Sequence, residues 1–151
     1  MAVVSLTGQD TIIINSRILS DLADADSGSI TFPNELASVK TGKNGNAIFA
    51  FNESGRQCDL SLRIVKGSPD DKFFNNFLSI QSSNFSGTLL LEGELIKRVG
   101  DGKGNITNDT YILTNGIISK NVDTKTNSDG DIEQSVSIYS LKFATAPRVI
   151  D

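Results

Sequence analysis

The sequence predicts a mainly β protein, an antiparallel β-sandwich or partly closed barrel with one flanking α-helix over about residues 68–81. Three observations favour this fold class. β-branched or alternating apolar segments recur along the chain, clusters of Gly, Asn, Asp and Ser separate them, and one segment has the apolar spacing of a helix. At 151 residues the chain can bury one substantial core, so we expect a single domain over 1–151.

The N-terminal part predicts one strand followed by a long arm. Thr11–Leu19 is rich in β-branched residues and is predicted as the first strand. Residues 20–46 are rich in Asp, Ser, Gly, Asn and Lys, and predict a long loop or arm with a short strand around Ser29–Phe32. A connection of this length in a compact domain usually has a function or is disordered.

The middle of the chain predicts a hairpin. Its expected strands are Asn46–Phe51 and Gln57–Lys66, and Asn52–Gly55 supplies turn-forming residues between them. In the second strand apolar and polar residues alternate, which is typical of a strand with one buried and one wet face. The buried set is Cys58, Leu60, Leu62 and Ile64, and the wet set is Asp59, Ser61 and Arg63.

A helix is predicted directly after this hairpin. Ser68 can cap the helix, and Pro69 suits its first position. Asp70 and Asp71 follow, where carboxylates oppose the positive end of the helix dipole. An apolar stripe at helical spacing is then expected to dock the helix on the sheet. Its residues are Phe73, Phe74, Phe77 and Leu78.

The C-terminal half predicts three more strands, at Thr88–Val99, Thr110–Lys120 and Ile132–Ala144. The glycine-rich segment Gly100–Asn105 links the first two, and Asp129-Gly130 is a hairpin turn signal before the third. In the last strand the apolar parity shifts between Ile138 and Tyr139, which indicates a bulge or contacts on both faces. Pro147 is expected to end this strand and leave a short tail.

The composition argues against several classes of function. A formal charge of −4 disfavours a nucleic-acid binder held by a basic surface. No apolar run approaches the roughly 20 residues of a membrane helix, and the start, MAVVSLTGQD, lacks the basic and apolar regions of a secretory signal. Cys58 is the only cysteine, so an intrachain disulfide is impossible, and its strand position predicts a buried thiol.

Catalysis has little support in the sequence. His is absent, which removes the commonest metal ligand and the commonest general base at neutral pH. We therefore expect no enzyme, no catalytic residues, no metal site and no cofactor, although carboxylates and lysines remain available.

Two segments resemble ligand-binding motifs, and each has a plainer interpretation. Gly100–Gly104 is glycine-rich, but a Walker-type phosphate loop needs Ser or Thr after Gly-Lys and a helix behind it, so a flexible hairpin loop is preferred. Asn127–Glu133 has the oxygen-rich character of a calcium loop. However, Ile132 and Ile138 fall where Gly and the bidentate Glu belong, so a solvated turn is preferred.

Two sets of charged residues remain. Glu92 and Glu94 lie two apart on a predicted strand, so their carboxylates share one face. A wet strand face is preferred to a glycosidase pair, which needs carboxylates across a cleft. The other set lies in the long arm, where a solvated loop and a contact arm that meets opposite charges on a neighbouring copy are both open. Its residues are Asp24, Asp26, Lys40 and Lys43.

The segment VKTGKNGNAIFAFNESGRQCDLSLRIVKGSPDDKFFN, from Val39 to Asn75, resembles the middle of the tail tube proteins of contractile-tailed bacteriophages. Those proteins run from a GxNG-type entry into a hairpin, and then through an R(I/V)xxGSxDDxxxN segment into the helix. The end of the chain, SLKFATAPRVID, is also similar. The matching residues here are Gly42, Asn44, Gly45 and Asn46, then Arg63, Gly67, Ser68, Asp70, Asp71 and Asn75.

The resemblance implies a structural protein of the virion tail, assembled in the cytoplasm of the bacterial host. Members form hexameric rings that stack into the hollow tube inside a contractile sheath, with strands of six copies joined around the lumen and the helix outside. The implied partners are further copies of the chain, the tail sheath protein, the baseplate and the tape measure protein. DNA passes through during ejection without specific binding.

The resemblance also implies positions in the tube for the charged residues. Asp24, Asp26, Lys40 and Lys43 become candidates for contacts between rings. An acidic lumen wall would repel DNA phosphates rather than trap them. The lumen-facing candidates are Asp59, Arg63, Glu92 and Glu94, of which Arg63 departs from a uniformly acidic wall.

Other hypotheses remain open beside the phage tube. A tube subunit of a non-phage contractile injection machine would have the same features. A monomeric β-sandwich that binds a ligand or protein predicts exposed aromatic residues, but Trp is absent and Tyr numbers only 2. A small hydrolase that uses Glu92 or Glu94 has the least support.

Overall fold

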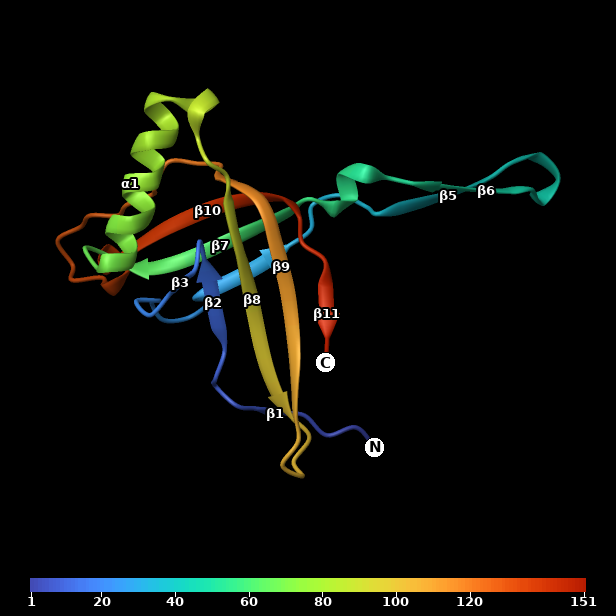
Figure 1. Ribbon diagram of the computed structural model, residues 1–151, viewed down its shortest axis with the longest axis horizontal. Coiled ribbons are helices and arrows are strands. Elements are labelled where there is room, and N and C mark those ends of the chain that lie inside the picture. Colours follow the sequence, from blue (N-terminus) through green and yellow to red (C-terminus); the bar gives the residue numbers. More distant parts are fainter.

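The computed structural model describes residues 1–151, in which one antiparallel sheet and one α-helix form the body and a thin arm projects from it (Figure 1). The sheet has nine strands in the order β3-β2-β8-β9-β10-β7-β4, with β1 paired to β8 and β11 paired to β9. A separate two-stranded sheet, β5-β6, forms the arm. The predicted fold class is confirmed, and the sheet is not a closed barrel.

Most elements follow one another along the chain with short connections, but a long one over residues 119–135 joins β9 to β10. The strands are β1 Ser5–Leu6, β2 Thr11–Ile14, β3 Arg17–Ile18, β4 Gly28–Thr31, β5 Ala37–Thr41, β6 Ala47–Phe51, β7 Cys58–Val65, β8 Leu91–Gly100, β9 Ile106–Ile118, β10 Val136–Thr145 and β11 Arg148–Ile150. The helix α1 spans Pro69–Ser83. Single turns of 3-10 helix lie at Lys43–Gly45, Glu53–Arg56, Phe85–Gly87 and Ile132–Ser135.

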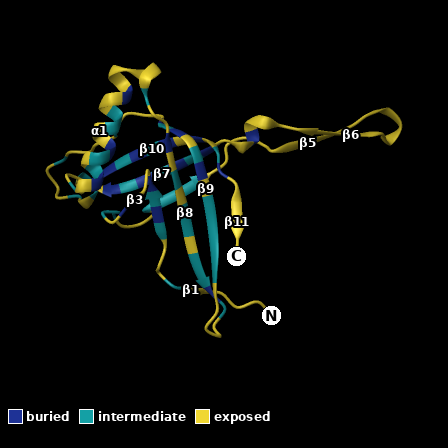
Figure 2. Ribbon diagram, in the orientation of Figure 1, coloured by how far each residue is buried: buried dark blue, intermediate teal, exposed yellow.

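The sheet bends until its two ends approach each other. A Cβ atom on Gly28 of β4 would lie 2.7 Å from Cδ1 of Ile12 in β2, closer than real atoms pack. A glycine in β4 therefore permits this approach. A cluster of 15 buried apolar residues, most of them from β2, β7, β8, β9, β10 and α1, lies inside the bend (Figure 2).

The alternation predicted for β7 is confirmed. Leu60, Leu62 and Ile64 are buried, and Asp59 and Arg63 lie on the outer face. On β10 the residues opposite the buried set, Tyr139 and Leu141 among them, are buried as well. The register between β7 and β10 runs unbroken from Val136 to Phe143, which excludes the bulge, the first of the two alternatives predicted for the last strand.

The predicted pairing of residues 46–51 with residues 57–66 is wrong. β6 pairs with β5, and the turn between them has positive φ at Asn44 and Gly45, as a tight hairpin turn requires. β7 has β4 on one edge and β10 on the other, so neither edge is free for β6. The short strand predicted near Ser29–Phe32 is β4.

Three other boundaries differ from the prediction. Thr11–Leu19 is a hairpin rather than one strand, because Asn15 and Ser16 both take positive φ between β2 and β3. Ile132–Ser135 is a 3-10 turn, so β10 begins at Val136 and Asp129-Gly130 lies in a longer loop. Pro147 ends β10, but the chain continues as β11 along β9 instead of leaving a tail.

The helix matches its prediction, and its first turn is tied to the sheet by two carboxylates. Ser68 caps the helix, with its hydroxyl accepting from the N–H of Asp71 at 3.2 Å. Asp70 is fully buried and accepts from Arg17 Nε at 2.7 Å and from the N–H of Ser20 at 2.9 Å. Asp71 accepts from the Tyr139 hydroxyl at 2.6 Å. Phe74 lies in the core, and Phe73, Phe77 and Leu78 pack against it.

Candidate functional site

The most unusual surface of the protein is the β5–β6 arm, which extends away from the body (Figure 1). β5 and β6 pair only with each other, from Ala37 opposite Phe51 to Thr41 opposite Ala47. Almost every residue of the two strands is exposed. A two-stranded ribbon without a packed face is marginal in water at best. The arm therefore lacks, within its own chain, the cover that its side chains need.

The two faces of the arm differ in chemistry. Directly opposed residues of an antiparallel pair lie on the same face. One face therefore carries Val39, Phe49 and Phe51, which are 60%, 75% and 53% exposed, and it carries no charged residue. The other face carries Lys40 opposite Ile48, and Lys43 lies at the tip. The arm thus has one apolar face, a lysine on its other face and a second lysine at its tip.

The root of the arm is held firmly by the segment that was predicted as a hairpin turn. The N–H of Asn52 donates to the Leu36 carbonyl at 2.8 Å, and its side-chain amide donates to the Glu35 carbonyl at 2.9 Å. Gly55 is buried against the same segment, where a Cβ would lie 2.5 Å from Leu36 Cα. Only glycine fits there. The direction in which the arm leaves the body is therefore fixed by local hydrogen bonds and packing.

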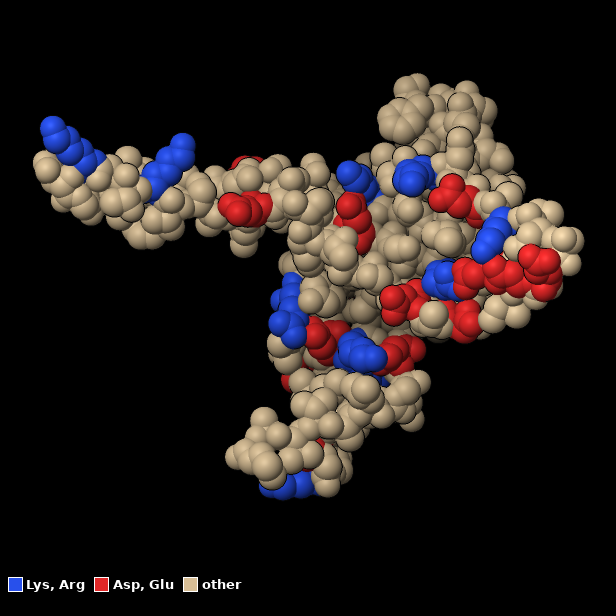
Figure 3. All heavy atoms as spheres, turned by 180° about the vertical axis from the view of Figure 1, so that it is seen from behind, with Lys and Arg blue, Asp and Glu red and all other residues tan.

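The four predicted contact residues lie in two separate places. Lys40 and Lys43 are on the arm, whereas Asp24 and Asp26 are in the loop between β3 and β4, on the body. Figure 3 shows basic side chains toward the end of the arm, whereas at the end of the body away from the arm acidic side chains lie interspersed with basic ones. Lys40, Lys43 and Asp26 form no ion pair within the chain. No single copy brings these opposite charges together.

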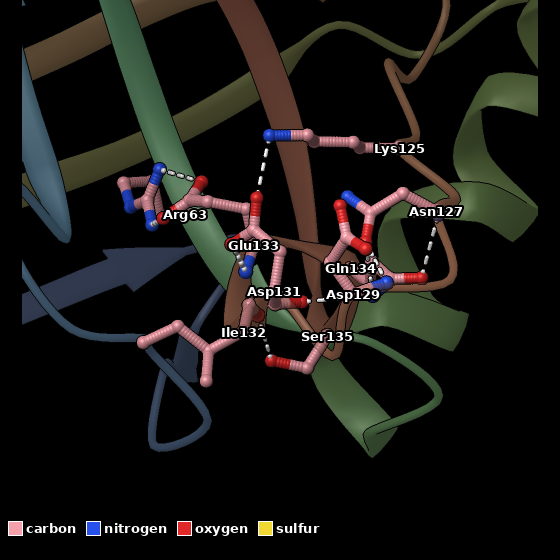
Figure 4. A network of polar contacts seen from close by, with 9 residues as sticks. All are labelled: Arg63, Lys125, Asn127, Asp129, Asp131, Ile132, Glu133, Gln134 and Ser135. Carbon is pink, nitrogen blue, oxygen red and sulfur yellow. Dashed lines mark hydrogen bonds and ion pairs between the residues drawn. The ribbon is translucent and has the colours of Figure 1, made fainter.

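The part of the body that carries Asp24, Asp131 and Glu133, called the acidic end below, is held together by a network of polar contacts, most of which Figure 4 shows. Arg63 donates to Glu133 at 2.6 Å and to Asp24 at 3.3 Å, which joins the loop after β9 to the loop before β4. The hydrogen bond to Glu133 raises the pKa of Arg63. Lys125 pairs with Asp131 and lowers the pKa of that carboxyl. In the segment that resembles a calcium loop, Asp131 thus has a lysine as its partner, and no group of three metal-ligating side chains gathers in the chain.

The four lumen candidates lie in two pairs, Asp59 and Arg63 on β7 and Glu92 and Glu94 on β8, with β9 and β10 between these strands in the sheet. The Lys142 amino group lies 3.8 Å from Oδ1 of Asp59, which is too far for a hydrogen bond, and Arg63 pairs with Glu133, so each charge has an oppositely charged neighbour in the chain. Glu92 and Glu94 come together, as their spacing predicted, and line one shallow hollow of about 610 Å³. Neither glutamate forms an ion pair.

The hollow has a mixed lining that the sequence did not reveal. Leu90 and Ile112, which are 48% and 36% exposed, line it beside the two glutamates. Glu92 is held at a register irregularity of β8, where its N–H donates to Asn15 Oδ1 at 3.0 Å. The positive φ of Asn15 places its side-chain amide beside the N–H of Glu92. In the sequence, the only signal for this turn is the Asn-Ser pair that follows the β-branched residues of β2.

Comparison with models of known protein families gives no match for this chain, and comparison with curated proteins gives no relative. None of the helices in the structure has the length and apolar character needed to cross a membrane.

Proposed function

We propose that this protein is a structural subunit that forms stacked hexameric rings, which make the inner tube of a contractile phage tail. The observation that carries this proposal is the arm. Apart from Arg56, whose guanidinium lies 5.0 Å from the centre of the Phe51 ring at the root, the apolar face of the arm has no cover within the chain. Exposed apolar surfaces of this kind mark sites of protein association. The resemblance of the Gly42–Asn46 entry and the Arg63–Asn75 segment to tail tube proteins supports the same function.

The arrangement of the surfaces supports self-assembly in particular. The arm and the body features that complement it, the acidic end and the Glu92–Glu94 hollow, belong to the same chain but cannot meet within it. A contact between different surfaces of identical copies is heterologous, and it generates rings if the rotation closes or filaments if it does not. The open sheet adds unpaired edges at β3 and β4, which neighbouring copies can cover.

In this proposal the tube is a passive conduit. Further copies of the chain are the main partners, and the sheath protein, the baseplate and the tape measure protein are the expected others in the virion tail. DNA passes without specific binding, since an acidic protein repels phosphate. A tube subunit of a non-phage contractile injection machine would show the same architecture.

Negative-stain electron microscopy of the purified, concentrated protein tests the proposal. Hollow rings or tubes whose class averages have six-fold symmetry are the expected result. Sedimentation velocity over a range of concentrations gives an independent measure of the assembled fraction. Monomers at every concentration would contradict self-assembly, and another ring symmetry would contradict the hexameric tube.

One observation favours a second function, that of a monomeric binding module. A cavity of about 650 Å³ lies where the arm joins the body, lined by Phe32, Leu36 and Tyr111 with Arg56 and Arg148 at its polar side. Its volume and apolar lining fit a small-molecule site. Monomeric behaviour together with saturable binding of one ligand, lost in a Tyr111→Ala variant, would support this function over the tube.

A further inference from the structure

The arm and the Glu92–Glu94 hollow each lack what the other provides. The arm has an apolar face without cover and two lysines without carboxylate partners. The hollow has exposed apolar side chains and two glutamates without cationic partners. Both surfaces therefore combine an apolar patch with unpaired charge, and the charges are opposite in sign.

We infer that the apolar face of the arm docks in the Glu92–Glu94 hollow of a second copy of this chain, with Lys43 at the tip beside the two glutamates. Lys40 lies on the opposite face, but every residue of a two-stranded ribbon is at an edge, so its long side chain reaches round that edge to bring its amino group to the same glutamates. The inference rests on the proposed function, and it names the receiving surface of the contact. Phe49 is the natural anchor, because it is a large aromatic side chain, 75% exposed, near the middle of the arm's apolar face. Aromatic anchors in pockets dominate the energetics of most interfaces.

The acidic end is the rival receiving surface, and it fits the arm less well. Its residues Asp24 and Glu133 are already paired with Arg63, and Asp131 is paired with Lys125. Its one strongly exposed apolar side chain is Ile132, whereas the hollow places Leu90 and Ile112 together beside its two glutamates. Burying a large apolar side chain contributes roughly 1.5–3 kcal/mol, whereas an exposed ion pair contributes about 0–1 kcal/mol. The apolar lining of the hollow therefore decides in its favour.

This contact also changes the role expected for Glu92 and Glu94. If Lys40 and Lys43 lie beside them, Glu92 and Glu94 belong to the contact between copies rather than to the lumen wall. The lumen candidates Asp59 and Arg63 have partners within their own chain, so neither leaves an unpaired charge for the wall.

A charge-swap series tests the inference. Lys40→Glu with Lys43→Glu, and separately Glu92→Lys with Glu94→Lys, should each raise the concentration needed for assembly about 10-fold or more, because like charges repel at the interface. All four changes in one chain should restore assembly. The matched control replaces the glutamate changes with Asp24→Lys and Asp26→Lys, which should not rescue the lysine variant. Rescue by the control, or unimpaired assembly of the lysine variant, would overturn the inference.

A crosslinking experiment gives a second readout that does not depend on loss of assembly. Chains with Ala47→Cys, on the apolar face of the arm, are mixed with chains with Ile112→Cys, in the hollow. Oxidation should link the two kinds of chain, and the native Cys58 is buried and does not compete. The control partner carries Ile132→Cys, which is exposed in the loop at the acidic end. Crosslinking to that control in place of Ile112→Cys would overturn the inference.

The two proposals fail separately. Six-fold rings whose formation ignores the charge swaps would overturn the docking site and leave the tube function in place. Charge-dependent association and Ala47–Ile112 crosslinking without rings would support the docking site and contradict the tube. Absence of any association in the wild-type protein would overturn both.

Discussion

At the scale of single residues, the carboxylate of Asp70 is the most constrained charge in the protein. It is fully buried and accepts from Arg17 Nε and from the N–H groups of Ser20 and Asp21. These bonds tie the start of α1 to the segment that follows β3. The sequence identified Asp70 only as a helix-dipole residue, because its partners lie some 50 residues away in the chain and no local pattern marks them.

Asp70→Asn should lower the free energy of unfolding by about 1.5–3 kcal/mol, the contribution of hydrogen bonds to charged groups. The substitution keeps the volume of the side chain but removes its charge and one acceptor oxygen. Urea denaturation of the variant and the wild type measures the difference. Asp26→Asn is the matched control, since Asp26 is exposed and unbonded, and its effect should stay within about 0.5 kcal/mol. Equal effects at the two positions would contradict the role given to Asp70.

Because the thiol of Cys58 is buried, we expect the protein to lose stability at alkaline pH. Burial raises the pKa of its thiol from 9.0 to about 11. Between these values the unfolded chain has released the proton that the folded protein still holds, so the free energy of unfolding falls as the pH rises from about 9 to about 11. Burial raises the pKa of Tyr139 in the same direction. Urea denaturation at pH 8, 9.5 and 10.5 should show a shallower alkaline decline in Cys58→Ala, and an unchanged decline would contradict this cause.

At the scale of elements, α1 and β7 could be predicted because their signals are local. The cap at Ser68, Pro69 and the aromatic stripe define the helix, and strict alternation defines β7. The pairing of β6 could not be predicted in this way. Asn44-Gly45 and Asn52–Gly55 both offer turn-forming residues, and the choice depends on the distant β4, which takes the edge of β7. The arm is also exposed on both faces, so no buried alternation reveals β5.

Phe74→Ala should lower the free energy of unfolding by about 3–5 kcal/mol, because it leaves a cavity where the helix meets the sheet. Phe74 is fully buried and its ring centroid lies 5.3 Å from that of Tyr139. Chemical denaturation measures the change. Ile80→Ala on the same helix is the control, since Ile80 is 52% exposed and its truncation should cost much less. Similar losses at both positions would show that the helix docks through another face.

Removal of the arm should leave a folded body that cannot assemble. The hydrogen bond from Asn52 to the Leu36 carbonyl places the two ends of the arm next to each other, so Asn-Gly can replace Ala37–Phe51 as a tight turn. The deletion spares β4, whereas one that began near Asp24 would remove a strand of the main sheet. Circular dichroism should show a cooperative unfolding transition like that of the wild type. Rings formed by this variant would contradict the role of the arm.

At the scale of the whole molecule, the apolar and charged parts of the proposed contact have different tasks. The apolar face of the arm supplies most of the affinity, since each large side chain that is buried contributes roughly 1.5–3 kcal/mol. Lys40, Lys43, Glu92 and Glu94 set the orientation and exclude wrong contacts, because charge complementarity governs specificity more than affinity. The candidate charges could be found in the sequence, but their division between arm and body required the three-dimensional arrangement.

This division of tasks predicts how assembly responds to salt. In about 1 M NaCl the Debye length falls to about 3 Å, so the ion pairs are screened while the apolar contact remains. Assembled wild-type protein should therefore persist in high salt, and the Lys40→Glu, Lys43→Glu variant should regain part of its assembly there because its repulsion is screened. Phe49→Ser should fail to assemble at any NaCl concentration, since it removes the anchor. Sedimentation velocity across a salt series measures all three proteins. Dissociation of the wild type by salt alone would show that charge, rather than the apolar face of the arm, holds the copies together.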